Sequence, residues 1–174
     1  MVAVRFVTHA EVNKTINFKI ETLNPEHGKE ISPKQSLDDF LDKMGFLESS
    51  NNYRKVNSLG YLGKYQFGRI TLKTLGYHHI SNEKFINSPE LQEQLMIKNL
   101  KFNKKVLNKL IDKYNGKCVN GVIITESGLL GAAHLAGARN VKRFLEHGHN
   151  PSDAYGTKLS DYLIKFSNYD LNLD

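Results

Sequence analysis

Apolar residues recur at helical spacing through most of the chain, and the first such segment begins with a clear start signal. Ser36 followed three residues later by Asp39 is typical of a capped helix N-terminus. The residues that then share one face of the predicted helix are Leu37, Phe40, Leu41, Met44 and Leu47. If this helix continues, Glu48 lies on the same apolar face, because it follows Met44 by one helical turn.

The same reasoning predicts further helices. A short one covers residues 69–75 and is stopped by Gly76, and a long one runs from Pro89 to about residue 114, since proline is favoured at the first helical position. A segment rich in small residues starts a helix at Ser127 that passes into Val141, Phe144 and Leu145, and a last helix covers residues 158–166. The glycines and asparagines of residues 49–67 predict a loop, and Asn-Gly pairs predict turns at residues 115–116 and 120–121.

The start of the chain has a different pattern. Apolar and polar residues alternate around Phe6 and again around Phe18, which predicts a short N-terminal β-hairpin within residues 2–23. Residues 24–35 have the composition of a linker. We therefore predict a mainly α fold (α+β) in two parts, an N-terminal extension over residues 1–35 and a helical domain over residues 36–174.

Composition narrows the choice of function without deciding it. The chain has 174 residues and one cysteine, Cys118, so an internal disulfide and a cysteine-based zinc cluster are excluded. No segment reaches the roughly 20 apolar residues of a membrane span, and no signal peptide is visible at the start. The net charge of +6 favours an anionic partner, such as nucleic acid, membrane or a cell-wall polymer, although such a charge also serves solubility alone.

Glu48 is the candidate for acid–base chemistry. It ends an apolar helix and faces a polar, glycine-rich loop, and a partly buried carboxyl group holds its proton closer to neutral pH than an exposed one. Such a group can protonate a leaving oxygen. The alternative is that Glu48 simply ends the helix and pairs with a lysine. The aromatic residues of the loop suit either stacking on a sugar ring or ordinary packing; they are Tyr53, Tyr61, Tyr65 and Phe67.

Through the segments Glu48-Ser49, Gly60 to Gln66, Ala133 to Gly137 and the region of Tyr162, residues 36–169 resemble the soluble lytic transglycosylases and goose-type lysozymes. Glu48-Ser49 is similar to their Glu-Ser motif, and Gly60, Gly63 and Gln66 follow at the family's spacing, with Lys64-Tyr65 in place of Leu-Met. A later segment, Ala133-His134-Leu135-Ala136-Gly137 with Val141, is similar to their Ala-Tyr-Asn-Ala-Gly motif, with His134 in place of the tyrosine and Leu135 in place of the asparagine. Tyr162 is the best match to the tyrosine that supports the catalytic acid.

The resemblance implies a lysozyme-like domain that acts at the bacterial cell wall and needs no cofactor. Glu48 would protonate the oxygen between N-acetylmuramic acid and N-acetylglucosamine in peptidoglycan. The residues that the resemblance assigns to substrate binding are Ser49, Gly63, Tyr65, Gln66, His134 and Tyr162. The route by which the protein reaches the wall is not predicted.

A single catalytic carboxyl group is compatible with two reactions. In a lytic transglycosylase the muramic C6 hydroxyl attacks and leaves a 1,6-anhydro end, whereas in a lysozyme water attacks, usually with help from a second carboxylate. The candidates for that second group are Glu126 and Asp153, with Asp161 as a further one. Because only Glu48 has a recognisable catalytic context, we predict a transglycosylase, with a hydrolytic muramidase as the alternative.

Other classes of function have weaker support. The seven histidines include His78-His79 and His147-x-His149, but no third ligand follows at useful spacing, so we predict no metal site. An inactive peptidoglycan-binding module is a second hypothesis, because the Ala-His-Leu-Ala-Gly segment departs from the family's motif. Nucleic acid is not an expected partner, since only charge supports it and the lysines are spread along the chain. The oligomeric state is not predicted.

Overall fold

The computed structural model describes residues 33–153 and 156–173. The chain divides into two units, Met1–Pro33 and Lys34–Asp174. The predicted β-hairpin of residues 2–23 lies outside the described residues. Within the described part the structure is mainly helical, which confirms the predicted fold class.

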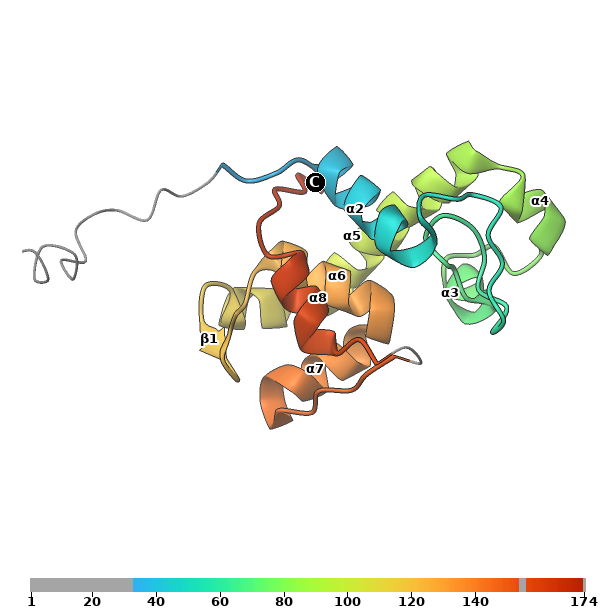
Figure 1. Cartoon of the computed structure of the whole chain (residues 1–174). Helices are drawn as coiled ribbons and strands as arrows, with labels where there is room; N and C mark the ends of the chain where they lie inside the picture. Colours follow the sequence, from blue (N-terminus) through green and yellow to red (C-terminus); the bar gives the residue numbers. More distant parts are fainter. Residues whose placement is uncertain (1–32, 154–155, 174) are drawn as a thin grey trace, which may run out of the picture. The chain divides into compact units, whose positions relative to one another are not determined.

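The described helices and strands follow one another along the chain, and a long loop over residues 50–68 joins α2 to α3 (Figure 1). The helices are α2 (Leu37–Ser49), α3 (Arg69–Thr74), α4 (Asn82–Ile86), α5 (Pro89–Tyr114), α6 (Glu126–Ala136), α7 (Ala138–His147) and α8 (Leu159–Lys165). The strands β1 (Cys118–Val119) and β2 (Val122–Ile123) form an antiparallel pair around the predicted Asn120-Gly121 turn.

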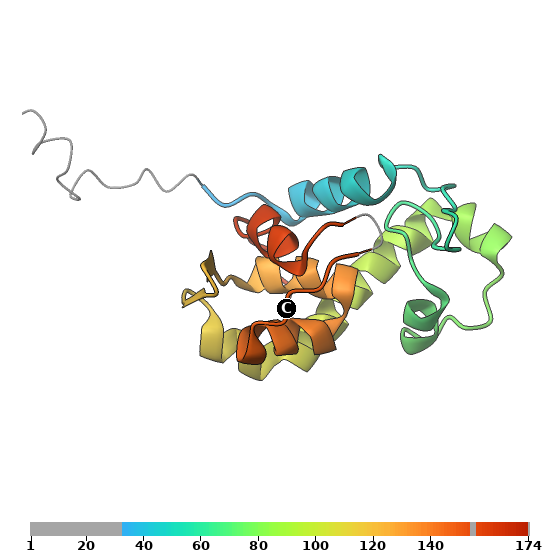
Figure 2. The ribbon, with the colours of Figure 1, turned by 60° about the horizontal axis from the view of Figure 1, so that its bottom comes forward.

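Helix α5 is the element against which the other helices are arranged. It begins with Pro89 at its first turn, as predicted, and buries Leu95, Met96, Leu100 and Leu107. Helix α4 packs against it, as do α6 and α7. Figures 1 and 2 show α3 and α4 beside the first half of α5 and α6 and α7 beside the second half, while α8 packs on α6.

The segment from Ser127 to Leu145, predicted as one helix, is two. Gly137 adopts a φ of +80°, which glycine tolerates because it has no Cβ. This conformation ends α6 before α7 begins. Thr125, not Ser127, caps α6 by accepting a hydrogen bond from the backbone N–H of Gly128. Helix α4, capped by Ser81, was not predicted from the pattern.

Helix α2 is tied to α8 and the segment after it. Its capping box of Ser36 and Asp39 forms as predicted. The Phe40 ring lies 4.7 Å from the ring of Phe166, centre to centre, and Gln35 bonds through its backbone to Asn168 and Asp170. Leu47 departs from the predicted apolar face, since it is 37% exposed. Because Phe40 is buried against Phe166, the end of α2 that carries Glu48 is directed toward α8.

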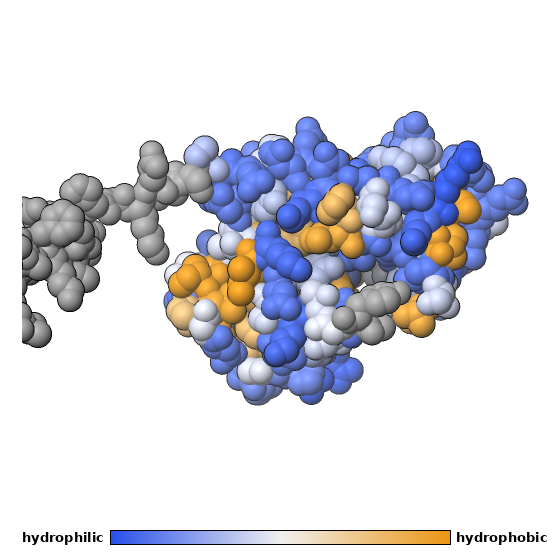
Figure 3. Space-filling view, viewed as in Figure 1, coloured by the Kyte–Doolittle hydropathy of each residue, from blue (hydrophilic) through white to orange (hydrophobic). Residues whose placement is uncertain are grey.

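The surface is mainly hydrophilic on the face shown in Figure 3, with separate apolar patches. One of these patches lies over the β1–β2 hairpin, where Ile123 is 57% exposed. Of the helices in the described ranges, none combines the length and the apolar character that a membrane crossing requires.

The close packing of the small residues of α6 predicts that enlarging one of them lowers the stability of the fold. A Cβ added at Gly131 would lie 2.8 Å from the Phe166 ring, so Gly131→Ala should lower the free energy of unfolding by about 1–3 kcal/mol. Urea unfolding measures the change. In a Phe166→Leu background the same substitution should cost less, because part of the ring is gone. An equal cost in both backgrounds would show that close packing against Phe166 is not the cause.

Candidate active site

Glu48 lies near the C-terminal end of α2, where the chain turns sharply. Ser50 and Asn51 have φ values of 58° and 60°, in the left-handed region, so the loop leaves the helix immediately after the Glu48-Ser49 pair. Glu48 is half-buried and lines a cavity of about 240 Å³. The cavity is lined by Glu48, Asn57, Leu59, Tyr61, Gln66, His134, Leu135 and Asp153.

Tyr162 holds the Glu48 carboxyl group. Its phenol donates a hydrogen bond to Oε1 of Glu48 across 3.0 Å, although the two residues are 114 positions apart. Burial raises the pKa of Tyr162, and the charge and hydrogen bond of Glu48 raise it further, with a smaller contribution from Asp153. The phenol therefore stays protonated and remains a donor to Glu48 across the physiological pH range.

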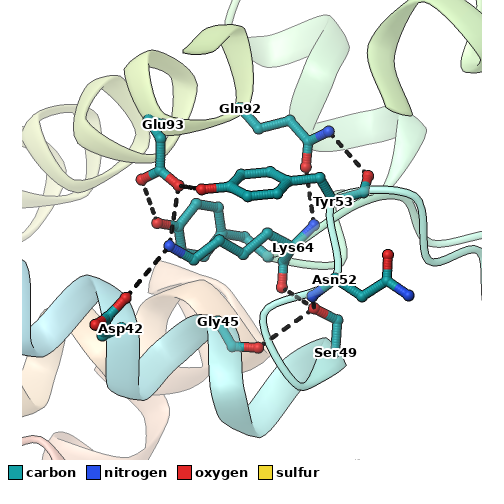
Figure 4. Close-up of polar contacts among 9 residues, drawn as sticks. Asp42, Gly45, Ser49, Asn52, Tyr53, Lys64, Gln92 and Glu93 are labelled. Carbon is teal, nitrogen blue, oxygen red and sulfur yellow. Dashed lines mark hydrogen bonds and ion pairs between the residues drawn. The ribbon is translucent and has the colours of Figure 1, made fainter. Parts of the chain in front are cut away.

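A cluster of polar side chains beneath the loop fixes its conformation (Figure 4). We call it the Lys64 cluster; it consists of Lys64, Glu93, Tyr53, Tyr65 and Asp42. Lys64 is 5% exposed, and its Nζ lies 3.0 Å from Oε1 of Glu93 and 3.6 Å from Oδ1 of Asp42. The hydroxyls of Tyr53 and Tyr65 both donate to the same carboxylate of Glu93. The cluster joins α2, the loop and α5.

The charges in the Lys64 cluster hold one another in the ionised form. Burial opposes ionisation of Glu93, but hydrogen bonds from Tyr65, Tyr53 and Lys64 outweigh it and lower the pKa of Glu93. Burial likewise opposes the charge of Lys64, but Glu93 outweighs it and raises the pKa of Lys64. Burial, with Glu93, raises the pKa of Tyr65. The Nζ of Lys64 also lies 5.1 Å from the ring centre of Tyr65, within range of a cation–π contact.

Gln92 is a second, neutral anchor for the same loop. Its side chain is fully buried; Oε1 accepts a hydrogen bond from the backbone N–H of Lys64, and Nε2 donates to the carbonyls of Tyr53 and Phe85. One helix residue therefore satisfies backbone groups at two points of the loop and at the end of α4.

Three residues expected to bind substrate hold the loop instead. Ser49 is buried and its hydroxyl donates to the Lys64 carbonyl across 2.7 Å, while it accepts from the backbone N–H of Asn52 (Figure 4). Gly63 lies so close to Gln92 that a Cβ would meet its Oε1. The Tyr65 side chain is fully buried and bonded to Glu93. None of the three lines the cavity at Glu48, so their side chains serve the loop's conformation.

Gln66 and His134 line the cavity, and both also form hydrogen bonds with other residues of the chain. Gln66 has a φ of 48°, and its Nε2 donates to the Gly63 carbonyl across 2.8 Å. The Asn99 Nδ2 lies 3.1 Å from Nδ1 of His134, and Nε2 of His134 lies 2.8 Å from the Tyr65 carbonyl oxygen. Because an amide nitrogen only donates and a carbonyl only accepts, we assign His134 as the neutral tautomer with its proton on Nε2. Its ring nitrogens are thus engaged in fixing the loop beside Gln66.

The three candidates for a second carboxylate lie in different places. Asp153 lines the cavity with Glu48, and its Oδ1 accepts a hydrogen bond from the backbone N–H of Thr157. Glu126 is at the start of α6, pairs with Lys104 at 3.2 Å, and lines another cavity with Tyr169. The structure therefore brings Asp153, but not Glu126, to the cavity of Glu48. Asp161 caps its own helix by accepting from the backbone N–H of Lys158.

Asn57 and Leu59 of the cavity were not among the site residues expected from the sequence, whereas Tyr61 was one of the loop aromatics considered for stacking on a sugar ring. Tyr61 is 43% exposed and Leu59 is 60% exposed, and both belong to a turn that Asn57 closes by accepting from their backbone N–H groups. The Asn57-Ser58 pair signals this turn, but nothing in the pattern shows that it faces Glu48. In the described ranges, no group of three histidine, cysteine, aspartate or glutamate side chains is arranged to hold a metal ion.

No family model, curated protein or solved structure matches this chain. The candidate site consists of a carboxyl group that a buried phenol holds at the wall of a cavity. The loop that also lines this cavity is held by the Lys64 cluster and Gln92.

The raised pKa values of Tyr65 and Tyr162 predict that the folded chain loses stability at alkaline pH. Because the pKa values of Tyr65 and Tyr162 are raised above the ordinary value of 10.0, the unfolded chain loses these protons first as the pH rises. The unfolded state then binds fewer protons than the folded state, so the melting temperature should fall above about pH 10. Tyr65→Phe should make the fall less steep, although it lowers stability at neutral pH. An unchanged slope in this variant would contradict the interpretation.

Proposed function

We propose that this chain cleaves the β-1,4 bond between N-acetylmuramic acid and N-acetylglucosamine in peptidoglycan, with Glu48 as the general acid. The observation that carries the proposal is the hydrogen bond from Tyr162 to Glu48, two residues far apart in the sequence that the resemblance assigned to one site. The shared cavity with Gln66 and His134 supports it further. The protein would accordingly act at the bacterial cell wall.

The geometry suits transfer of a proton to a glycosidic oxygen. The Tyr162 phenol occupies Oε1 of Glu48, which leaves Oε2 to carry the transferable proton. Tyr162 also restricts rotation of the carboxyl group, so the proton is directed at one position in the cavity. The exposed Tyr61 offers an aromatic face of the kind on which sugar rings stack.

We propose that the chain is a lytic transglycosylase, with a hydrolase as the alternative. An intramolecular C6 hydroxyl needs no activating carboxylate, because the substrate itself holds it near the reacting carbon. Asp153 favours the hydrolase, since it lines the same cavity as Glu48 and could activate a water molecule there. The products distinguish the two reactions.

Glu48→Gln should lower the rate of peptidoglycan cleavage by about 10²-fold or more, because the amide keeps the shape of the side chain but has no proton to transfer. Release of soluble fragments from purified peptidoglycan measures the rate. Glu83→Gln, the same change at an exposed position of α4, is the matched control and should leave the rate unchanged. A Glu48→Gln variant as active as the control would refute Glu48 as the acid.

Mass spectrometry of the digest should find muramic residues with 1,6-anhydro ends. Asp153→Asn should then cleave at close to the wild-type rate, since the amide keeps the Oδ1 that accepts from Thr157. Glu126→Gln, in the other cavity, serves as the control. Reducing ends that disappear with Asp153→Asn but persist with Glu126→Gln would establish hydrolysis instead.

A further inference from the structure

The outer face of α5 combines lysines with exposed apolar side chains. Between positions 98 and 113 this helix, which the structure describes in full, has one exposed carboxylate, that of Asp112. Its other exposed residues there are Lys98, Lys101, Phe102, Lys105, Val106, Asn108, Lys109 and Lys113. Phe102 is 42% exposed and Val106 is 52% exposed. A helix that only needed solubility would have no reason to present these two apolar residues among its lysines.

These residues lie along one side of the helix. Phe102 precedes Lys105 by three positions and Val106 by four, and Lys109 follows Lys105 by four and Val106 by three, which places the four side chains next to one another on an α-helix. From Lys98 to Lys113 the stripe is about 22 Å long, at 1.5 Å per residue. The opposite side of α5 is buried in the core, so this helix presents the stripe while remaining part of the domain.

An exposed residue of α3 extends the apolar part of the stripe. Ile70 is 83% exposed and lines a cavity of about 280 Å³ together with Phe102. That cavity shares Tyr61, Gln66 and His134 with the cavity of Glu48. We call this surface the lysine face and define it by Ile70, Lys98, Phe102, Lys105, Val106 and Lys109. Its apolar end thus adjoins the candidate active site.

The positive charge of the lysine face is not cancelled within the domain. Among the described residues, neither Lys105 nor Lys109 forms an ion pair. The Nζ of Lys98 donates to the Leu75 carbonyl, which does not neutralise its charge. The face is therefore complementary to a negatively charged surface.

We propose that the lysine face docks the domain on an anionic phospholipid bilayer. Lysines interact with the headgroup phosphates, while the apolar side chains enter the boundary between headgroups and acyl chains. A linear polyanion would satisfy the lysines but would leave Ile70, Phe102 and Val106 in water. A second copy of the chain would bring like charges together. The proposal does not depend on the cleavage reaction.

Flotation with vesicles tests the charged part of this surface. The chain should bind vesicles of equal parts phosphatidylglycerol and phosphatidylcholine, and not vesicles of phosphatidylcholine alone. Lys105→Gln/Lys109→Gln should lower the partition coefficient about 25-fold, at about fivefold per lysine. Lys43→Gln/Lys84→Gln removes the same charge from exposed positions of α2 and α4 and should have a much smaller effect. Equal losses in the two variants would overturn the proposal, because net charge alone would then explain binding.

A second pair of variants tests the apolar part. Ile70→Ser/Val106→Ser should weaken vesicle binding, whereas Ile123→Ser/Ile164→Ser, at residues of similar exposure elsewhere, should not. Thermal unfolding checks that all four variants are folded. Duplex DNA and polyphosphate serve as competing polyanions. Binding to either that exceeds vesicle binding and survives Ile70→Ser/Val106→Ser would overturn the bilayer as the partner.

Discussion

The buried ion pair between Lys64 and Glu93 is the interaction on which the site depends. Two charges removed from water are costly, and they are tolerated here because Glu93 also receives two tyrosine hydroxyls. Removing Glu93 would leave the buried ammonium group of Lys64 without its nearest partner, at a cost below the roughly 3–5 kcal/mol of a fully buried pair, because the Glu93 side chain is 30% exposed. Gly45 makes the arrangement possible, because a Cβ there would collide with the Lys64 side chain. Helix α2, the loop and α5 are thereby held in one arrangement.

The Lys64 cluster supports one side of the site, and hydrogen bonds from α6 and α8 support the other. Below the loop, the Lys64 cluster and Gln92 fix backbone groups on either side of Gly63. Across the cavity, His134 holds the Tyr65 carbonyl from α6, and Tyr162 holds Glu48 from α8. Both walls of the cavity are therefore supported by side chains from elements remote in sequence. Packing in turn holds the side chains that form these hydrogen bonds. Such support restricts the carboxyl group without filling the cavity, which is what proton transfer to a bound ligand requires.

The sequence predicted the elements that carry local signals and missed those that depend on distant contacts. Ser36 with Asp39 and Pro89 act within one helical turn, so the starts of α2 and α5 could be read directly. Gly137 could not be read as a break, since small residues continue on both sides and only its φ separates α6 from α7. The pairing of Lys64 with Glu93 was missed for a different reason. Charged residues are normally exposed, and these two are 29 positions apart, so no periodicity joins them.

The same difference explains which of the residues expected to bind substrate line the cavity of Glu48. His134 and Gln66, which the resemblance assigned to two motifs, both line it. Tyr65 belongs to the same motif, but its hydroxyl bonds to Glu93, so its ring is withdrawn into the core. A motif match thus transfers the path of the backbone more safely than the role of a side chain. In this chain Lys64 and Tyr65 hold the loop by charge and hydrogen bonds. Its stability then depends on the protonation of that cluster, which an apolar loop would not require.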